Sequence, residues 1–389
     1  MEGSIIGAAF EQALQLRAEG REIFDLTSGE PDFATPGNVS RAGHEAIDAG
    51  ATKYTPTDGT EELKAAVALK FQRDNDVVYE TSEICIGAGA KPLLYYVLLS
   101  ILDTDDEVII PTPAWASFPG MVQLAGARPV LSLCERSTGY KLTPTALEAA
   151  ITQDTKALIL NTPTNPTGAV YNKSEMQALG QVLEAHPRII VVADEIYEHL
   201  VYDVEFTCFV HANPNLKERT VVVNGASKGY AMTGWRIGYA AGPVEVMNTI
   251  RKLLSHSAGN PTTLSQLAAI EALTGPQDQV QVRAASYKAR RDKAVMTLNQ
   301  APGLAVERPD GAFYLYVDCS ETIGRRTPDG DKLENSADFC TYLLQSEGVA
   351  TVPSAGFYAQ GALRMSYACD DATLTEACRR MVRACNALV

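Results

Sequence analysis

The chain has no apolar run that approaches the roughly 20 consecutive residues needed by a membrane-spanning helix. Its N-terminal sequence, Met-Glu-Gly-Ser-Ile-Ile-Gly, also lacks the basic region with which a secretory signal peptide begins. We therefore expect no transmembrane segment, no signal peptide and no membrane partner. The expected location is the cytoplasm.

Metal-ligating side chains are few and scattered. The five histidines have no metal-ligand spacing, and the eight cysteines form no Cys-x-x-Cys pair. A chain of 389 residues with this cysteine usage is unlike a small disulfide-stabilised domain. We expect reduced thiols and neither a metal site nor a disulfide framework.

An excess of basic residues is also missing. Lys and Arg number 33 against 47 Asp and Glu, so the formal net charge is −14. Proteins that bind nucleic acids or anionic membrane surfaces neutralise phosphates with basic side chains. The composition therefore argues against both kinds of partner, while a local positive site for a small anionic ligand stays possible.

What the chain does contain is a long alternation of strand-like and helix-like patterns. Short apolar runs rich in β-branched residues predict strands at 84–87, 107–110, 128–133, 156–161, 188–193, 220–223 and 237–241. Helical patterns lie at 40–49, 61–74, 91–101, 116–125, 144–151, 173–185 and 243–256. Strands that alternate with helices predict an α/β fold with a mostly parallel sheet covered by helices on both faces.

The C-terminal part has a different pattern. Residues 262–298 are helical with a break at Gly275-Pro276, and the rest predicts strands at 304–307, 312–317, 349–352 and 362–366 with helices at 335–346 and 371–388. This arrangement indicates a smaller α+β domain. We predict an N-terminal segment (1–40) that packs with the small domain, a large domain (41–285) and a small domain (286–389). The ligand site is expected in the cleft between the domains.

Lys228 follows the apolar run 220–223 and a short loop. This places it past the end of a buried strand, where open α/β sheets bind ligands. A lysine at such a site can form a Schiff base with an aldehyde if its amine is held deprotonated. Arg236 offers a planar cationic fork that suits a phosphate. An aldehyde that carries a phosphate is pyridoxal 5'-phosphate (PLP). Taken alone, a solvated lysine and a surface ion pair would be the ordinary explanations.

Three polar residues that follow the two preceding strands, 156–161 and 188–193, could complete such a site. Asp194 directly follows an apolar strand, and buried carboxylates need a partner such as a pyridinium nitrogen. A helix N-cap is the alternative role for Asp194. Tyr197 is within reach of the same ligand. Asn165 lies in a rigid Asn-Pro-Thr-Gly loop and could donate a hydrogen bond, whereas Asn161 is expected to serve only the turn.

Further candidates lie at other strand ends. The small residues Gly89 and Ala90 could expose amides to a phosphate at a helix N-terminus. Trp115 could stack on a flat ring or pack in the core. Arg364 lies in an apolar strand with no acid beside it, and a buried charge needs a partner. A substrate carboxylate gripped bidentately or a structural ion pair would satisfy it.

These stretches together resemble the class I/II PLP-dependent aminotransferases of fold type I, and the bacterial Ib-type aspartate aminotransferases in particular. The motifs that carry the resemblance are Asn-Pro-Thr-Gly (165–168), Asp-Glu-Ile-Tyr (194–197) and Ser-Lys-x-x-x-Met-Thr-Gly-Trp-Arg (227–236). It implies a large domain with a mostly parallel seven-stranded sheet and a small α+β domain. It also implies a homodimer with shared active sites.

The resemblance implies a role for each cofactor-binding residue. Lys228 would hold PLP as an internal aldimine and later move the substrate proton, and Asp194 would pair with the pyridine nitrogen. Tyr197 and Asn165 would bond the ring 3′-oxygen. The phosphate would be held by Arg236, Ser227, the amides of Gly89 and Ala90, and Tyr54 of the partner subunit.

The resemblance also implies the substrate contacts. Arg364, with Gly29 and Asn165, would bind the α-carboxylate, and Trp115 would stack on the ring. Lys91 would contact the distal carboxylate of a dicarboxylic substrate, although a solvated helix lysine is the alternative. The implied reaction is a ping-pong transfer of the amino group between L-aspartate, or a related amino acid, and 2-oxoglutarate.

Other functions are weighed against this one. Ala114 stands where the resembled family often has an aromatic residue, and such departures favour another PLP enzyme on the same scaffold, such as a β- or γ-eliminating lyase. The acidic composition counts against a DNA-binding PLP regulator. A nicotinamide-dependent dehydrogenase is disfavoured because no Gly-x-Gly-x-x-Gly opens a helix before a ribose-binding acid.

Overall fold

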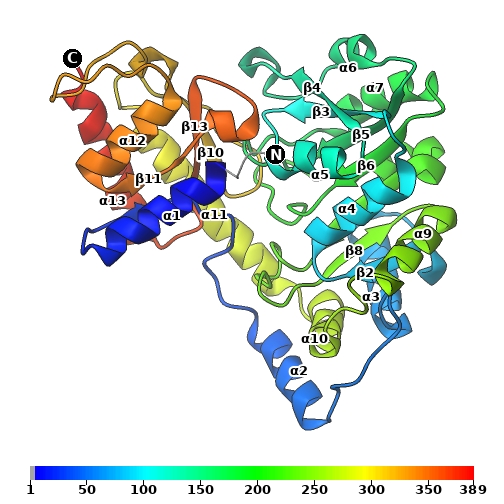
Figure 1. Cartoon of the computed structure of the whole chain (residues 1–389). Helices are drawn as coiled ribbons and strands as arrows, with labels where there is room; N and C mark the ends of the chain where they lie inside the picture. Colours follow the sequence, from blue (N-terminus) through cyan, green and yellow to red (C-terminus); the bar gives the residue numbers. More distant parts are fainter. Residues whose placement is uncertain (1–4) are drawn as a thin grey trace.

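The computed structural model describes residues 5–389, which form a larger part around one sheet and a smaller part around two sheets (Figure 1). Residues 1–4 of the predicted N-terminal segment lie outside the described residues. No helix among residues 5–389 is long and apolar enough to cross a membrane.

The larger part is built on a sheet with the strand order β2-β8-β7-β6-β5-β3-β4. Neighbouring strands run parallel except at β8, which is antiparallel to both β2 and β7. The strands are β2 (Ile84–Gly87), β3 (Glu107–Thr112), β4 (Arg128–Leu133), β5 (Thr155–Asn161), β6 (Ile190–Asp194), β7 (Thr220–Gly225) and β8 (Gly238–Ala241). The predicted seven-stranded, mostly parallel sheet is confirmed.

Both faces of this sheet are buried. In β5, Leu158 and Leu160 pack in one hydrophobic cluster, while Ala157 and Ile159 pack in the cluster on the opposite face. The first cluster includes residues of α3 (Glu61–Asn75), α7 (Lys173–Glu184) and α10 (Thr263–Thr274). The second includes residues of α4 (Ala90–Ile101), α5 (Ser117–Leu124) and α9 (Val244–Ser255). Burial on both faces explains why the strands are apolar at nearly every position.

The parallel strands bring their carboxyl ends to one edge of the sheet. Asn161 at the end of β5 lies beside Asp194 at the end of β6, and Asp194 lies beside Val223 in β7. The turn that holds Lys228 begins just beyond β7. Polar residues that are far apart in the chain therefore meet at this edge.

The smaller part contains a four-stranded antiparallel sheet with the order β12-β13-β10-β9 and a two-stranded sheet of β1 and β11. Its strands are β1 (Phe24–Asp25), β9 (Ala305–Val306), β10 (Tyr314–Asp318), β11 (Val349–Ala350), β12 (Val352–Pro353) and β13 (Ala362–Ser366). The helices α12 (Ser336–Glu347) and α13 (Asp371–Ala387) contact these strands.

The predicted single strand 349–352 is wrong. Thr351 separates β11, which pairs in parallel with β1, from β12, which pairs antiparallel with β13. The chain therefore changes sheets within this apolar run. Hydrophobic pattern alone predicts that such a run is extended, but it does not say which neighbours its backbone will bond.

The two parts are connected by α11 (Asp278–Leu298), which runs in Figure 1 from the vicinity of α10 to the smaller part. The helix α1 (Ile5–Ala18) contacts β11 and β12, so the N-terminal segment joins the C-terminal elements. The predicted boundary at 285/286 falls inside α11, and the division into domains stays a prediction.

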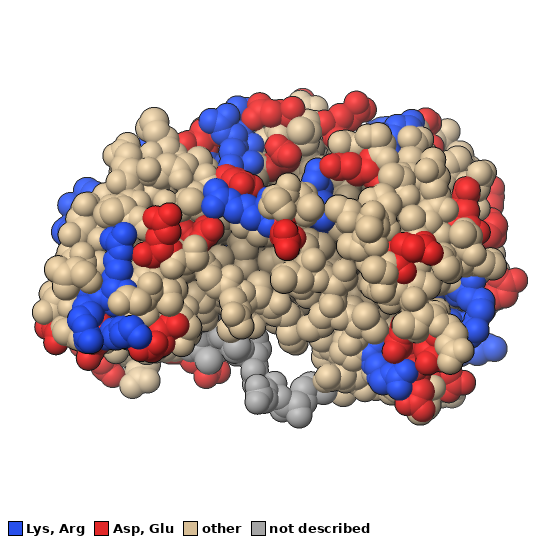
Figure 2. All heavy atoms as spheres, turned by 90° about the horizontal axis from the view of Figure 1, so that it is seen from above, with Lys and Arg blue, Asp and Glu red and all other residues tan. Residues whose placement is uncertain are grey.

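The remaining helices lie in the connections. They are α2 (Gly37–Asp48), α6 (Pro144–Ala150), α8 (Phe209–Ala212) and the 3₁₀ helices η1 (Thr81–Glu83), η2 (Arg136–Thr138), η3 (Pro214–Arg219), η4 (Ser320–Thr322) and η5 (Ser354–Phe357). On the face shown in Figure 2, basic side chains are interspersed with acidic ones and do not gather into one broad basic field.

Candidate active site

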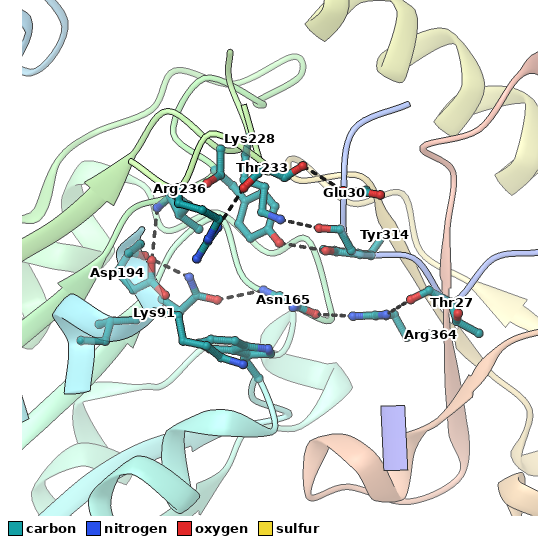
Figure 3. Close-up of a pocket in the computed structure, with 18 residues that line it drawn as sticks. Thr27, Glu30, Lys91, Asn165, Asp194, Lys228, Thr233, Arg236, Tyr314 and Arg364 are labelled. Carbon is teal, nitrogen blue, oxygen red and sulfur yellow. Dashed lines mark hydrogen bonds between the residues drawn. The ribbon is translucent and has the colours of Figure 1, made fainter. Parts of the chain in front are cut away.

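A cavity of about 330 Å³ lies at the carboxyl edge of the large sheet, between the two parts of the molecule (Figure 3). Its lining comes from the larger part, the smaller part and the N-terminal segment of the chain. The residues are Thr27, Gly29, Glu30, Ala90, Lys91, Leu94, Trp115, Asn161, Asn165, Asp194, Ile196, Tyr197, Ser227, Lys228, Thr233, Arg236, Tyr314 and Arg364. The residues predicted from the sequence all lie in this lining except Gly89 and Tyr54.

Lys228 projects into the cavity from the turn after β7, and its Nζ donates a hydrogen bond to the carbonyl of Gly29. Burial lowers the pKa of this amine to about 8. The carboxylate of Glu30 opposes that shift in pKa, whereas the cations of Arg364 and Arg236 add to it. A lysine whose pKa is near 8 is partly neutral at physiological pH and can act as a nucleophile or a base.

Asp194 is a buried carboxyl group without a cationic hydrogen-bond partner among the described residues. Its Oδ1 accepts a hydrogen bond from the amide of Ile196 at 3.3 Å. Burial raises the pKa of Asp194 to about 7, which the amide of Ile196 and the charge of Lys228 only partly oppose. The predicted alternative of a helix N-cap is wrong, because residues 196–199 form a turn and no helix begins there. A cationic ring nitrogen would supply the missing partner.

Tyr197 is buried beside Tyr314, and their hydroxyl groups are 2.8 Å apart. The two rings come from opposite parts of the molecule, since Tyr197 follows β6 and Tyr314 begins β10. The amine of Lys228 lies 5.9 Å from the centroid of the Tyr197 ring. The phenol pair thus forms the wall of the cavity beside the lysine.

Asn165 connects the loop after β5 to Arg364. Its Oδ1 accepts a hydrogen bond from Nη1 of Arg364 at 3.1 Å. Its amide donates to Oδ1 of Asn161 at 2.9 Å, and Nδ2 of Asn161 donates to the carbonyl of Asp194 at 3.0 Å. Asn161 therefore holds the turn together, as predicted, although it also lines the cavity.

Arg364 is a buried cation, 2% exposed, with no carboxylate within ion-pair distance among residues 5–389. Its Nη2 donates to the carbonyl of Thr27 at 2.6 Å, and its Nε has no hydrogen-bond partner. The guanidinium lies 4.5 Å from the centroid of the Tyr314 ring. The alternative of a structural ion pair is thus not observed, and a ligand carboxylate would satisfy this charge.

The other end of the cavity has the geometry of an anion site. Gly89, with φ of +100°, precedes the N-terminus of α4, and a Cβ there would come within 2.4 Å of Nη2 of Arg236. Arg236 donates to the carbonyls of Thr233 and Ala88 at 2.9 and 3.2 Å and pairs with no carboxylate in the described part of the chain. Ser227 is buried next to Lys228. Free helix amides, a hydroxyl group and a guanidinium are the donors that bind phosphate.

Lys91 and Trp115 form the wall near the N-terminus of α4. Nζ of Lys91 lies 4.9 Å from the centroid of the Trp115 ring, and the Trp115 ring packs edge-to-face on Phe118 at 5.3 Å. Burial and the nearby charge of Arg236 lower the pKa of Lys91. The lysine has no acidic partner among the described residues, so its charge is available to a ligand.

Tyr54 is the predicted residue that does not reach this cavity. It lies on the loop between α2 and α3, and 97% of its side chain is exposed. A side chain this exposed is available to contact another molecule, and its position is compatible with a role in the site of a partner subunit.

Several lining residues were missed by sequence reasoning. Thr27 and Tyr314 reach the site only through the pairing of β10 with β13 and the packing of the N-terminal segment. Thr233 donates to Glu30 at 2.8 Å across 203 residues of sequence. Thr233 belongs to the motif 227–236 quoted above, which was the one available signal, whereas none of the quoted motifs contains Glu30. No local pattern pointed to Tyr314.

The cavity as a whole suits a ligand with more than one anionic group. Arg236, Lys91 and Arg364 are cations without carboxylate partners within the described residues, and they surround the reactive amine of Lys228. The unpaired carboxyl group of Asp194 faces the same space. These groups fit PLP, which has a phosphate, an aldehyde and a ring nitrogen, together with a substrate carboxylate.

Comparison with known proteins places these features in context. Residues 21–381 match the model of the family described as aminotransferase class I and II. An aspartate/prephenate aminotransferase from Cereibacter sphaeroides is 46% identical over 382 residues, which cover 98% of this chain and 96% of that protein. An aspartate aminotransferase from Rhizobium meliloti is 44% identical, over 97% of this chain and 92% of that protein.

Solved structures agree with the sequence comparisons. The crystal structure of the Rhizobium meliloti aspartate aminotransferase superposes with a TM-score of 0.98 at 43% identity, covering 100% of this chain and 98% of that one. The Thermus thermophilus aspartate aminotransferase with maleate superposes with a TM-score of 0.92 at 39% identity, covering 99% and 97%. The similarity therefore extends over the whole chain rather than one domain.

Proposed function

This chain belongs to the aminotransferase class I and II family and is a transaminase, and on that premise we propose that it transfers the amino group of L-aspartate, or of a related dicarboxylic amino acid, to 2-oxoglutarate in a ping-pong reaction. The observation that carries the proposal is the cavity in which Lys228, Asp194, Arg236 and Arg364 converge. The match to this family sets aside the dehydrogenase alternative and favours transfer over elimination.

The cofactor is proposed to be PLP bound covalently to Lys228. Arg236, Ser227 and the amides of Gly89 and Ala90 would hold its phosphate, and Asp194 would face its ring nitrogen. Tyr197 and Asn165 would bond its 3′-oxygen, and Trp115 would stack on the ring. When bound, PLP supplies an electron sink for the negative charge that develops at the substrate Cα.

The residues of the chain then have distinct tasks. Arg364 grips the α-carboxylate and, with Asn165 and the Gly29 loop, orients the substrate so that its Cα–H faces the amine of Lys228. As a free amine, Lys228 would take up that proton at Nζ and later give it back, since its lowered pKa of about 8 leaves a neutral fraction at physiological pH. Asp194 would supply the negative charge that favours a protonated ring nitrogen.

Lys91 supports a dicarboxylic substrate. Its charge has no acidic partner among residues 5–389 and lies at the Trp115 side of the cavity, opposite Arg364 in Figure 3. Two cations at separate ends can each bind one carboxylate. Maleate, named with the Thermus thermophilus structure, is such a dicarboxylate. The name of the Cereibacter sphaeroides relative makes prephenate a second candidate acceptor.

The molecule is proposed to act as a homodimer in which Tyr54 of the partner subunit reaches the phosphate. The division into an N-terminal segment (1–40), a large domain (41–285) and a small domain (286–389) also remains a proposal, as does a cytoplasmic location. The eight free cysteines support the last of these, since thiols persist in a reducing compartment.

The test is an absorption spectrum of the purified protein with PLP, recorded before and after addition of L-aspartate. We expect a visible band that disappears with aspartate while oxaloacetate is released, and that returns on addition of 2-oxoglutarate. L-Alanine is the control, because it has an α-carboxylate but lacks the distal carboxylate that Lys91 would bind. A visible band that does not change when aspartate is added would contradict the assignment of aspartate as the substrate. Return of the visible band on addition of prephenate instead of 2-oxoglutarate would identify prephenate as the second acceptor.

A further inference from the structure

The turn that contains Lys228 contacts a buried arginine of α11. Arg283 is 4% exposed and has no carboxylate within ion-pair distance among the described residues. Its guanidinium donates to two carbonyl groups, that of Ala34 at 2.7 Å from Nη2 and that of Gly229 at 3.4 Å from Nη1. It also lies 5.8 Å from the centroid of the Phe33 ring. One cation thus connects the lysine turn with the N-terminal loop.

Other arginines on the same helix form ion pairs with carboxylates. Arg290 pairs with Asp32, and the fully buried Arg291 pairs with Asp203 and Asp292. A buried cation without a counter-charge costs free energy, and an apolar side chain of similar size would remove that cost. The presence of Arg283 therefore calls for a role beyond packing, and its two carbonyl acceptors indicate which segments it serves.

Both acceptors belong to segments that meet at the reactive amine. Gly229 follows Lys228 directly, and Ala34 lies on the loop between β1 and α2 that also contains Gly29 and Glu30. That loop reaches the amine itself, because Nζ of Lys228 donates to the carbonyl of Gly29. The loop and the lysine turn thus meet at this hydrogen bond, and Arg283 joins them a second time through the carbonyls of Ala34 and Gly229.

The lysine turn also contacts a second side chain, the imidazole of His199. A Cβ on Gly229 would come within 2.7 Å of Cδ2 of His199, so the imidazole packs directly on the glycine. The His199 ring is in turn fixed edge-to-face against Tyr230 at 5.5 Å. Gly229 therefore contacts an imidazole as well as a guanidinium, and the imidazole limits its movement toward His199. Removal of the guanidinium would leave the contact with His199 in place.

We propose that Arg283 is a positioning residue for Lys228. By bridging the carbonyls of Gly229 and Ala34, it fixes where the amine lies relative to the loop of Gly29. The planar fork of arginine reaches both carbonyls at once, whereas the single ammonium of a lysine would reach one. The inference rests on the proposed function, in which Lys228 binds PLP and moves the substrate proton.

The experiment compares Arg283→Met and Arg283→Lys with Arg291→Met, a matched loss of a buried arginine from the same helix. The rate of covalent PLP capture by the full chain freed of cofactor is measured at a pH well above 8, where the amine is neutral and only its position matters. We expect Arg283→Met to slow capture by about tenfold or more, and Arg283→Lys by less. Arg291→Met should lower the melting temperature but capture PLP as fast as the wild type.

A second measurement uses the holoenzyme. The kcat for L-aspartate should fall with the capture rate in the Arg283 variants, while KM changes little because Arg364 is untouched. Capture at the wild-type rate in Arg283→Lys and in any folded Arg283→Met would make Arg283 merely structural and overturn the inference, as would equal slowing in Arg291→Met. Failure of the wild-type chain to capture PLP would overturn the proposed function and the inference with it.

Discussion

At the scale of single residues, the site is defined by charges that lack partners within the described chain. Burial lowers the pKa of Lys228 and raises that of Asp194, to about 8 and about 7. Arg364 holds a full charge with an unsatisfied Nε. Buried groups in this condition are costly unless a ligand completes them. The unpartnered cations of this site therefore favour a ligand with more than one anionic group.

The lowered pKa of Lys228 leads to a pH prediction. Only the neutral amine attacks an aldehyde, so the rate of PLP capture should rise tenfold per pH unit below about 8 and level off above it. Because the negative charge of Glu30 raises the pKa of Lys228, Glu30→Gln should move the midpoint to lower pH.

The control for this prediction is Glu245→Gln, which removes an exposed carboxylate on α9 away from the cavity. It should leave the midpoint where it is. A midpoint that stays unchanged or rises in Glu30→Gln would contradict the role assigned to the Glu30 charge.

At the scale of elements, the anion site depends on how closely β8 approaches the turn between β2 and α4. A Cβ on Gly238 would lie 2.3 Å from the amide nitrogen of Ala90 and 2.4 Å from the carbonyl carbon of Gly89. These contacts are with backbone atoms, which cannot rotate away. Glycine at the start of β8 therefore allows the N-terminus of α4 to sit where it can present its amides.

Gly238→Ala should accordingly displace the N-terminus of α4. We expect the affinity for PLP to fall by about tenfold or more and the free energy of unfolding to decrease by about 1–3 kcal/mol, as in other overpacked sites. The measurements are a PLP titration followed by absorbance and a denaturant unfolding curve.

The matched control is Gly120→Ala in α5, where a Cβ would meet no atom within 4 Å. Alanine is the better helix former by about 0.5–1 kcal/mol, so this variant should be as stable as the wild type or more stable. Unchanged PLP affinity in Gly238→Ala would mean that the α4 amides do not hold the phosphate.

At the scale of the whole molecule, the cavity of one chain is formed without Tyr54, which is exposed on the loop between α2 and α3. In Figure 1 this loop and α2 extend away from the larger sheet. If two chains share their active sites, this loop is the natural donor. The proposed dimer therefore predicts complementation between two inactive proteins.

Lys228→Ala should abolish turnover, and Tyr54→Ala should reduce it strongly. In a mixed dimer, the site that contains the intact Lys228 also receives the intact Tyr54 from the other chain. Random pairing makes half of the dimers mixed, so mixing after mild dissociation should restore about a quarter of the wild-type activity. The assay is oxaloacetate formation from L-aspartate, with each variant alone as the control. Activity no greater than the sum of the two separate proteins would mean that each site is formed by one chain.

Site residues could be predicted from the sequence where they belong to local motifs at the ends of strands. Lys228, Asp194, Asn165 and Arg236 stand in local motifs that follow apolar strands, and parallel strands bring such positions to one edge by the geometry of the sheet. The large sheet was predictable for the same reason, because each strand and helix has its own periodicity.

Sequence alone thus determined the elements around the seven-stranded sheet, the family resemblance and the residue types available for chemistry. Only the tertiary structure decided the pairing of β10 with β13 that presents Tyr314, the split of the run 349–353 between two sheets, and the link of Arg283 to Gly229. The physical reason is the range of the interactions. Periodicity and turn chemistry act within a few residues, whereas these contacts join segments far apart in the chain and form only when the whole core packs.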